Sequence, residues 1–389
     1  MSPNNLEQPW LDEFESIRSF HDCEVREQVE QLVHSVQFNL QMMQLFLGIS
    51  PDNSETATRK LADLKESMKQ ADTVSEFQLV EKRFLSDVLS GMLNQVTVFG
   101  LENLSKQQNH LFISNHRDIV LDPLVLNWAL LKNGFATCHC AIGDNLLAEE
   151  SGKRLARLNH CFAVMRSIRS PRAMVAAMKV QSAYIRHIRF NQSAPVWIAQ
   201  REGRSKDNTD KTNPALLKML ALAKPREMSF TSYIRRLNIV PVSLSYEWDP
   251  CDIQKAEQVC SEQLGSYKKT GNEDLQAVKA GITGEKGQIH CQFNAGFNKH
   301  LEEELNHLEV AARLDHAIHH GYRLFPVNIA ACELIKHPLP PTTGHAFTNE
   351  QINSARAALE KRIENQPDMI QNRIKKSYAQ PALNLAESG

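Results

Sequence analysis

The sequence places a histidine and two acidic residues close together, as His116, Asp118 and Asp122, directly after the short apolar run 111–113. Histidine is the one side chain whose ordinary pKa lies near neutrality, and a neighbouring carboxylate fixes its tautomer and its ring orientation. The segment could therefore supply a general base and its orienting acid. A capped loop followed by a surface residue would give the same letters, so the segment alone does not decide between a catalytic and a structural role.

Three later segments also join strand-like apolar runs to residues that could bind or shape a ligand. Residues 162–165 are apolar and end on Arg166. Residues 197–206 run from an apolar strand pattern into an acid, a glycine and three cations. Residues 239–246 form a buried-strand pattern with an internal proline, Pro241. A short motif is weak support for function, but an ordered set of four is stronger.

Taken in this order, the four segments resemble the glycerophospholipid acyltransferase superfamily. The family pattern is HxxxxD, a histidine with an aspartate five residues later, then G-x-x-F-x-x-R, E-G-x-R-S and a V-P-V strand. This chain departs from the pattern twice. Asp122 stands six residues after His116, with Leu121 at the fifth position, and no glycine precedes Phe162 at the expected place. Either Asp122 is the partner of the histidine in a longer loop, which we favour because it stands just before an apolar helix, or Asp118 has taken that role.

The resemblance also implies roles for individual residues. His116 would be the general base, and Asp122 or Asp118 its partner. Arginines would bind the phosphate of the acceptor, because the N–H groups of the planar guanidinium match the geometry of phosphate oxygens. The acceptor-site residues implied in this way are Arg166, Arg201, Glu202, Gly203, Arg204 and Ser205, and Pro241 would mark the strand beside the acyl donor.

Two stretches, 14–22 and 114–123, further resemble a bacterial subgroup described as 1-acylglycerol-3-phosphate acyltransferases. The resemblance implies an O-acyltransferase that moves a fatty acyl chain from acyl-CoA or acyl carrier protein to a lysophospholipid, with 1-acylglycerol-3-phosphate favoured. It implies no cofactor beyond this co-substrate and no metal. Two alternatives remain open. The chain could be a non-catalytic relative that binds lipid or carrier protein, or a thioesterase that uses the same histidine with water.

The charge is distributed unevenly although the formal net charge is only −1. Residues 1–100 hold 8 Lys and Arg against 16 Asp and Glu, whereas residues 151–240 hold 18 against 4. The basic segment favours an anionic partner such as a phosphate headgroup, a membrane surface or an acidic carrier protein. Nucleic acid is disfavoured as a partner, because the cations are interspersed among apolar strands and helices and no nucleic-acid-binding motif is recognisable.

The same features suggest where the protein works. No window reaches the 18 apolar residues of a membrane-spanning helix, so we expect peripheral attachment to the cytoplasmic (inner) membrane. The eight cysteines are scattered and show no disulfide framework, which favours the cytoplasm. Cys138-His139-Cys140 is better explained as a strand than as a zinc site, because no second ligand pair stands nearby.

The periodicity of apolar residues predicts an α/β fold with a mixed, mostly parallel sheet flanked by helices, and with helical additions at both ends. We expect a helical region at 1–98, a catalytic domain at 99–296, and a helical region at 297–389 with a proline-rich break at 338–341 and a tail that frays. Strands are predicted at 109–114, 136–142, 161–166, 195–200 and 238–246, with a last strand at 288–293 closing the sheet, and helices at 122–132, 145–157, 170–188, 214–222 and 252–264.

Overall fold

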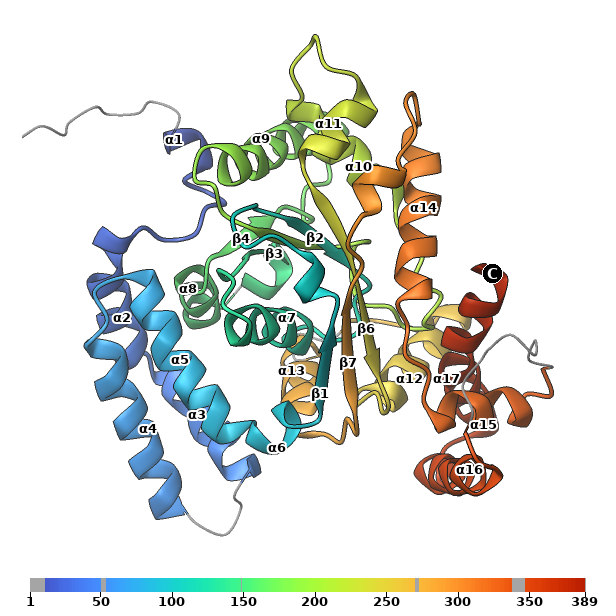
Figure 1. Cartoon of the computed structure of the whole chain (residues 1–389). Coiled ribbons are helices and arrows are strands. Elements are labelled where there is room, and N and C mark those ends of the chain that lie inside the picture. The colour runs from blue at the N-terminus through green and yellow to red at the C-terminus, as the bar shows by residue number, and fades with distance from the viewer. Residues whose placement is uncertain (1–10, 50–53, 148, 270–272, 338–346, 389) are drawn as a thin grey trace, which may run out of the picture. The chain divides into compact units, whose positions relative to one another are not determined.

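The computed structural model describes residues 11–49, 54–147, 149–269, 273–337 and 347–388 (Figure 1). The chain forms two compact units, and each is built from several stretches of sequence. Unit 1 comprises residues 1–87, 138–198 and 218–237, and unit 2 comprises 88–137, 199–217 and 238–389. The three predicted regions, 1–98, 99–296 and 297–389, stay a prediction.

Unit 1 joins N-terminal helices to three strands. The strands lie in the order β5-β3-β4 and are parallel, with His139 in register with Val196 and Cys140 with Cys161. The elements that lie mainly in this unit are α1 (Leu11–Phe14), η1 (Asp22–Glu24), α2 (Val25–His34), α3 (Val36–Ile49), α4 (Ser54–Lys69), α5 (Val74–Val88), β3 (His139–Gly143), η3 (Asp144–Leu147), α8 (Glu150–Leu158), β4 (Cys161–Val164), α9 (Pro171–Phe190), β5 (Val196–Ala199), η4 (Ala221–Ala223) and α11 (Phe230–Arg236).

Unit 2 holds four strands in the order β1-β7-β6-β2. β1 is parallel to β7 and β2 to β6, whereas β6 and β7 are antiparallel. The elements of unit 2 are α6 (Ser90–Leu93), β1 (Val96–Phe99), η2 (Leu101–Asn103), β2 (Leu111–Ser114), α7 (Leu121–Lys132), α10 (Pro214–Leu220, which continues into unit 1), β6 (Ile239–Tyr246), α12 (Asp252–Gln263), α13 (Glu273–Thr283), β7 (Ile289–Phe293), η5 (Phe297–His300), α14 (His307–His320), α15 (Pro326–Leu334), α16 (Asn349–Ile363) and α17 (Asp368–Ser388).

The predicted fold class is confirmed: the chain is α/β, with a mixed, mostly parallel seven-stranded sheet and flanking helices. Each predicted strand and helix overlaps an observed one. The prediction missed β1, a four-residue strand that pairs with β7 alone among the described residues. The late strand β7 was predicted to close the sheet, but it lies between β1 and β6. It therefore sits inside the sheet.

The C-terminal helices form a packed layer. α15, α16 and α17 enclose a buried apolar cluster that includes Phe325, Leu359 and Ile374. The expectation of a fraying tail is wrong for residues 368–388, because α17 buries Tyr378 and its neighbours in this cluster. The predicted break at 338–341 lies outside the described residues. None of the described helices combines the length and apolar character needed to cross a bilayer.

Candidate functional site

The start of α7 brings His116 and Asp122 together. β2 delivers His116 into a short connection, and Asp122 is the second residue of the helix that follows. The Nδ1 atom of His116 lies 2.7 Å from Oδ2 of Asp122. Because a carboxylate only accepts hydrogen bonds, Nδ1 carries the proton and donates it. The Asp122 side chain is fully buried, whereas 12% of the His116 side chain is exposed.

Asp122 is held by the chain on both of its oxygens. Oδ2 also accepts hydrogen bonds from the backbone N–H groups of Arg117, at 2.6 Å, and Asp118, at 3.0 Å. Oδ1 accepts one from the Tyr246 hydroxyl at 2.9 Å. A carboxylate in the first turn of a helix is also stabilised by the helix dipole. The extra residue between His116 and Asp122 is therefore absorbed by a turn whose backbone N–H groups point at the carboxylate.

Asp118 has a different environment. Its Oδ1 accepts hydrogen bonds from the backbone N–H groups of Val120 and Leu121, both at 2.9 Å, and so satisfies the first turn of α7. Its Oδ2 is buried and has no hydrogen-bond partner among the described residues. Burial raises the pKa of the Asp118 carboxyl, and the nearby charge of Asp122 raises it further. Of the two acids considered from the sequence, Asp122 contacts the histidine and Asp118 caps the helix.

The segment 200–205 is tied to the histidine by backbone hydrogen bonds. Gln200 N donates to Ser114 O at 2.8 Å, and Ser205 N donates to His116 O at 2.7 Å. Gly203 adopts a φ of +72°, and a Cβ there would meet nothing within 4 Å. The glycine is therefore required by its left-handed backbone rather than by crowding within the chain. This turn brings residues 201–205 beside the connection 115–120 between β2 and α7, which carries His116 and is called the histidine loop below.

The polar side chains of this turn differ in their surroundings. Ser205 is buried, and its Oγ accepts a hydrogen bond from Asn208 N at 3.0 Å, so it has a structural partner. Glu202 is exposed, and Arg201 is partly buried. Arg204 is partly buried, and its Nη1 is buried without a hydrogen-bond partner among the described residues. A buried guanidinium N–H without an acceptor is unfavourable, which marks Arg204 as a group that a bound anion would satisfy.

Residues 95–245 match a family model described as Acyltransferase. The chain is also 27% identical over 257 residues to "Glycerol-3-phosphate acyltransferase" of Ectopseudomonas mendocina (strain ymp). Both likenesses support the resemblance of this stretch to the glycerophospholipid acyltransferase superfamily. The match covers 62% of this chain and 29% of the length of that relative. The stretch that matches the family model includes His116, Asp122 and the 200–205 turn, and it ends one residue before Tyr246.

Two other predicted site residues, Arg166 and Pro241, also lie within the matched stretch. Arg166 belongs to unit 1, where its backbone N–H donates to Asp144 at 3.1 Å. Pro241 lies within β6, in register with Ile113 of β2, and its carbonyl accepts a hydrogen bond from Asn294 N at 2.9 Å. Neither contact tests the substrate-binding roles that the resemblance implies, so these roles stay predictions.

The sequence analysis missed three residues that hold the histidine loop. Tyr246 donates to Asp122, as described above. Arg117 is buried and pairs through Nη2 with Asp210 Oδ2 at 2.6 Å. Burial opposes the charge of Arg117, but the nearby groups Asp210, Tyr322, Asp249 and Asp122 together outweigh it, and the pKa of Arg117 is raised. Only Arg117 could have been suspected from sequence, because it follows the histidine directly.

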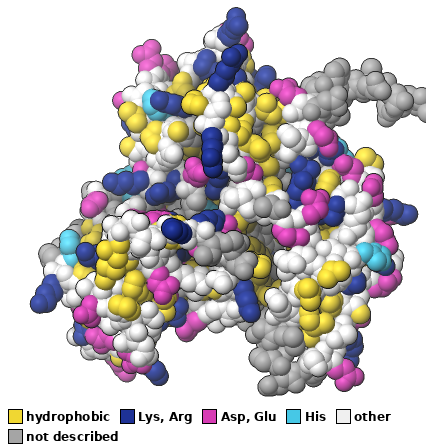
Figure 2. All heavy atoms as spheres, turned by 180° about the vertical axis from the view of Figure 1, so that it is seen from behind, with side chains coloured by type: hydrophobic (Ala, Val, Ile, Leu, Met, Phe, Trp, Pro, Cys, Tyr) yellow, Lys and Arg dark blue, Asp and Glu magenta, His cyan; other side chains and the backbone are white. Residues whose placement is uncertain are grey.

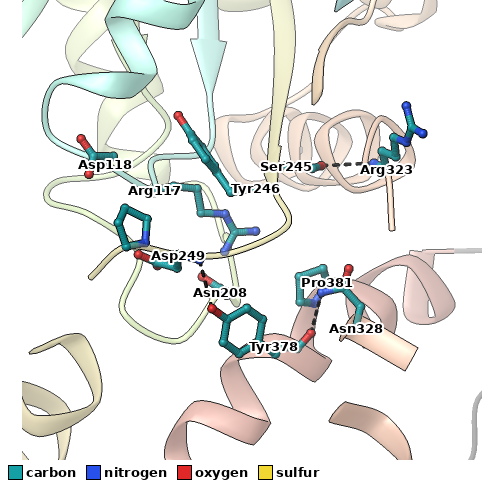
Figure 3. Close-up of a pocket in the computed structure, with 11 residues that line it drawn as sticks. Arg117, Asp118, Asn208, Ser245, Tyr246, Asp249, Arg323, Asn328, Tyr378 and Pro381 are labelled. Carbon is teal, nitrogen blue, oxygen red and sulfur yellow. Dashed lines mark hydrogen bonds between the residues drawn. The ribbon is translucent and has the colours of Figure 1, made fainter. Parts of the chain in front are cut away.

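A pocket of about 500 Å³, its open mouth included, lies beside this loop (Figure 3). Arg117, Asp118 and Tyr246 form one side of it. The C-terminal helices α15 and α17 contribute Asn328 and Tyr378. The remaining lining residues are Asn208, Ser245, Asp249, Pro250, Arg323 and Pro381. The part of the chain beyond the superfamily match therefore completes the surroundings of the histidine loop.

Proposed function

We propose that the protein is an O-acyltransferase that moves a fatty acyl chain from a thioester to the hydroxyl of a lysophospholipid, with 1-acylglycerol-3-phosphate as the favoured acceptor. The observation that supports it best is the hydrogen bond between His116 and the buried Asp122 inside the superfamily domain. A base with an oriented ring and a fixed tautomer is what an attacking hydroxyl needs.

In the proposed reaction, Nε2 of His116 takes the proton of the acceptor hydroxyl while its oxygen attacks the thioester carbonyl. Asp122 stabilises the imidazolium that forms. The C–S bond then breaks, the new ester forms, and the thiolate leaves with the proton that the imidazolium returns. The arrangement follows the logic of the serine hydrolase triad, with the hydroxyl supplied by the substrate. No side chain needs to carry the acyl group.

The acceptor phosphate would be bound by arginines. Arg204 supports this part of the proposal, because its buried Nη1 lacks an acceptor within the described chain and its turn is tied to the backbone of His116. Arg201 and Glu202 would border the same site, which Gly203 and Ser205 shape. Arg166 and Pro241 enter the proposal through the family resemblance alone, the first for the phosphate and the second beside the acyl donor.

The donor would be acyl-CoA or acyl carrier protein, since both present the same thioester to the base. No further cofactor is included in the proposal. Parallel assays with the same acyl chain on CoA and on carrier protein would decide between them.

We also place the protein peripherally on the cytoplasmic surface of the inner membrane. The stretch 151–200 contains nine Lys and Arg and no Asp or Glu. The first half of α9 in this stretch exposes Arg172, Val175 and Lys179. On the face shown in Figure 2, cations lie among hydrophobic side chains and carboxylates. Cations beside exposed apolar groups suit an anionic lipid surface, where each Lys or Arg contributes about 1 kcal/mol.

The deciding experiment measures thiol release and lipid product together. Purified protein is given an acyl-CoA, or acyl carrier protein, with and without lysophosphatidate, and the lipids are analysed by mass spectrometry. We expect thiol release that depends on the acceptor, a phosphatidate product, and loss of both in His116→Ala. Thiol release without acceptor would indicate a thioesterase. Binding of substrates with no release from either donor would indicate a non-catalytic relative, and full activity of His116→Ala would refute the base.

A further inference from the structure

The two oxygens of Asp122 are held by different parts of the chain. Oδ2 is served by the loop itself, through His116 Nδ1 and two backbone N–H groups. Oδ1 receives its hydrogen bond from Tyr246, which lies 124 residues away in sequence. Among the described residues, Tyr246 is the side chain that fixes Oδ1. The hydrogen bond from Tyr246 therefore hinders rotation of the carboxylate about the Cβ–Cγ bond of Asp122.

Tyr246 is well suited to this position. It ends β6, a strand whose other residues are all buried, so its backbone is anchored in the sheet. Burial, followed by the charges of Asp122 and Asp118, raises the pKa of Tyr246 well above its ordinary value. The hydroxyl therefore keeps its proton and remains a donor to the carboxylate at any pH where the enzyme would work. Tyr246 also lies just outside the superfamily match, which ends at residue 245.

We propose that Tyr246 is a positioning residue for the His116–Asp122 pair, with its hydroxyl holding Oδ1 so that Oδ2 faces His116 Nδ1. This inference rests on the proposed function, in which His116 is the base. Tyr246 would not exchange a proton with the substrate. Its contribution is to keep the carboxylate in the one rotation that orients the imidazole and to draw part of the negative charge away from Oδ2.

Loss of the hydroxyl has two consequences of the same sign. A buried oxygen that loses its donor disfavours the ionised carboxylate. Where the carboxylate stays ionised, its charge is less shared and attracts an imidazolium more strongly. Both effects move the acid limb of the pH–rate profile to higher pH, because that limb follows the loss of a neutral imidazole beside an ionised carboxylate. The other ionisable groups facing Asp122 are Arg117 and Asp118 on the loop and Cys291 on β7.

The test is Tyr246→Phe, which keeps the ring and removes only the hydroxyl. We expect kcat to fall about tenfold with little change in the KM of the acceptor, the size associated with one hydrogen bond to a charged group. The acid limb of kcat/KM should rise by about one pH unit. In ¹⁵N-histidine-labelled protein, the Nδ1 proton resonance of His116 should change. Tyr267→Phe is the matched control, because it removes a tyrosine–carboxylate hydrogen bond to Glu273 elsewhere in unit 2.

The outcomes separate the inference from the proposed function. If His116→Ala is inactive but Tyr246→Phe keeps the wild-type acid limb and the wild-type Nδ1 resonance, the positioning role is refuted. If His116→Ala is active, the proposed base is refuted, and the Nδ1 resonance alone then decides whether Tyr246 orients the pair. A fall in kcat without any change in the acid limb or the resonance, matched by Tyr267→Phe, would reduce Tyr246 to a general structural contribution and overturn the proposal.

Discussion

The histidine loop and the 200–205 turn are joined by a backbone hydrogen bond. They differ in whether their buried polar atoms have hydrogen-bond partners within the chain. In the loop, both oxygens of Asp122 have donors from the chain itself. In the turn, Arg204 keeps a buried Nη1 without an acceptor within the described chain. Under the proposed function, this difference means that His116 is oriented before any substrate arrives, whereas Arg204 gains its acceptor from the substrate. Four substitutions test this contrast, in order of decreasing expected effect.

The largest effect on activity is expected in the histidine loop, from His116→Ala. A positioned general base contributes roughly 10²–10⁴-fold to the rate, so kcat should fall by about that factor while the fold is retained. Steady-state thiol release and a thermal melt measure the two quantities. His34→Ala, at an exposed histidine in unit 1, is the control. A loss of activity matched by an equal loss in the control would contradict a specific role.

Asp122→Asn should be nearly as severe. The amide keeps the size of the side chain but can present an N–H to Nδ1, which favours the wrong tautomer of the histidine. We expect kcat to fall by about 10²-fold or more. A pH profile of kcat/KM measures it. A fall of only a few fold would show that the histidine needs no anionic partner.

Arg204→Gln tests whether the 200–205 turn binds the phosphate of the acceptor. Because the guanidinium would contact the acceptor phosphate, KM for lysophosphatidate should rise about 10–100-fold. A monoacylglycerol that lacks the phosphate should be affected little, so the preference for the phosphorylated acceptor should collapse. Arg313→Gln, which breaks an exposed ion pair with Glu302, is the control. An unchanged preference would remove Arg204 from the acceptor site.

Asp118→Asn should have the smallest effect on activity and a pH-dependent effect on stability. Burial raises the pKa of this carboxyl in the folded state. The stability that it contributes is therefore present below its unfolded pKa and is lost as pH rises through the folded pKa. The variant should gain melting temperature relative to wild type at neutral pH, and the gain should shrink in acid. A gain that grows toward low pH would contradict this sign.

The sequence was informative wherever structure is local. Short apolar runs predicted β2 and β6, because a strand buried on both faces is apolar at most positions, and the longer apolar stretch after Asp122 predicted α7. β1 was missed, since a short strand that pairs on one side carries little pattern, and its Phe99 is 52% exposed. The expectation of a fraying tail was wrong because the apolar residues of α17 pack in a buried cluster with α15. The expectation had rested on the polar composition of the tail alone.

By itself the sequence determined the ordered blocks, the fold class and the choice of His116 with two candidate acids. The tertiary structure decided which acid contacts the histidine, because the extra residue is absorbed by a turn whose backbone donors point at Asp122. It also supplied Tyr246 and the Arg117–Asp210 pair, which join segments far apart in the chain. Such contacts depend on how the strands order themselves in the sheet, and no local spacing of residues encodes that order.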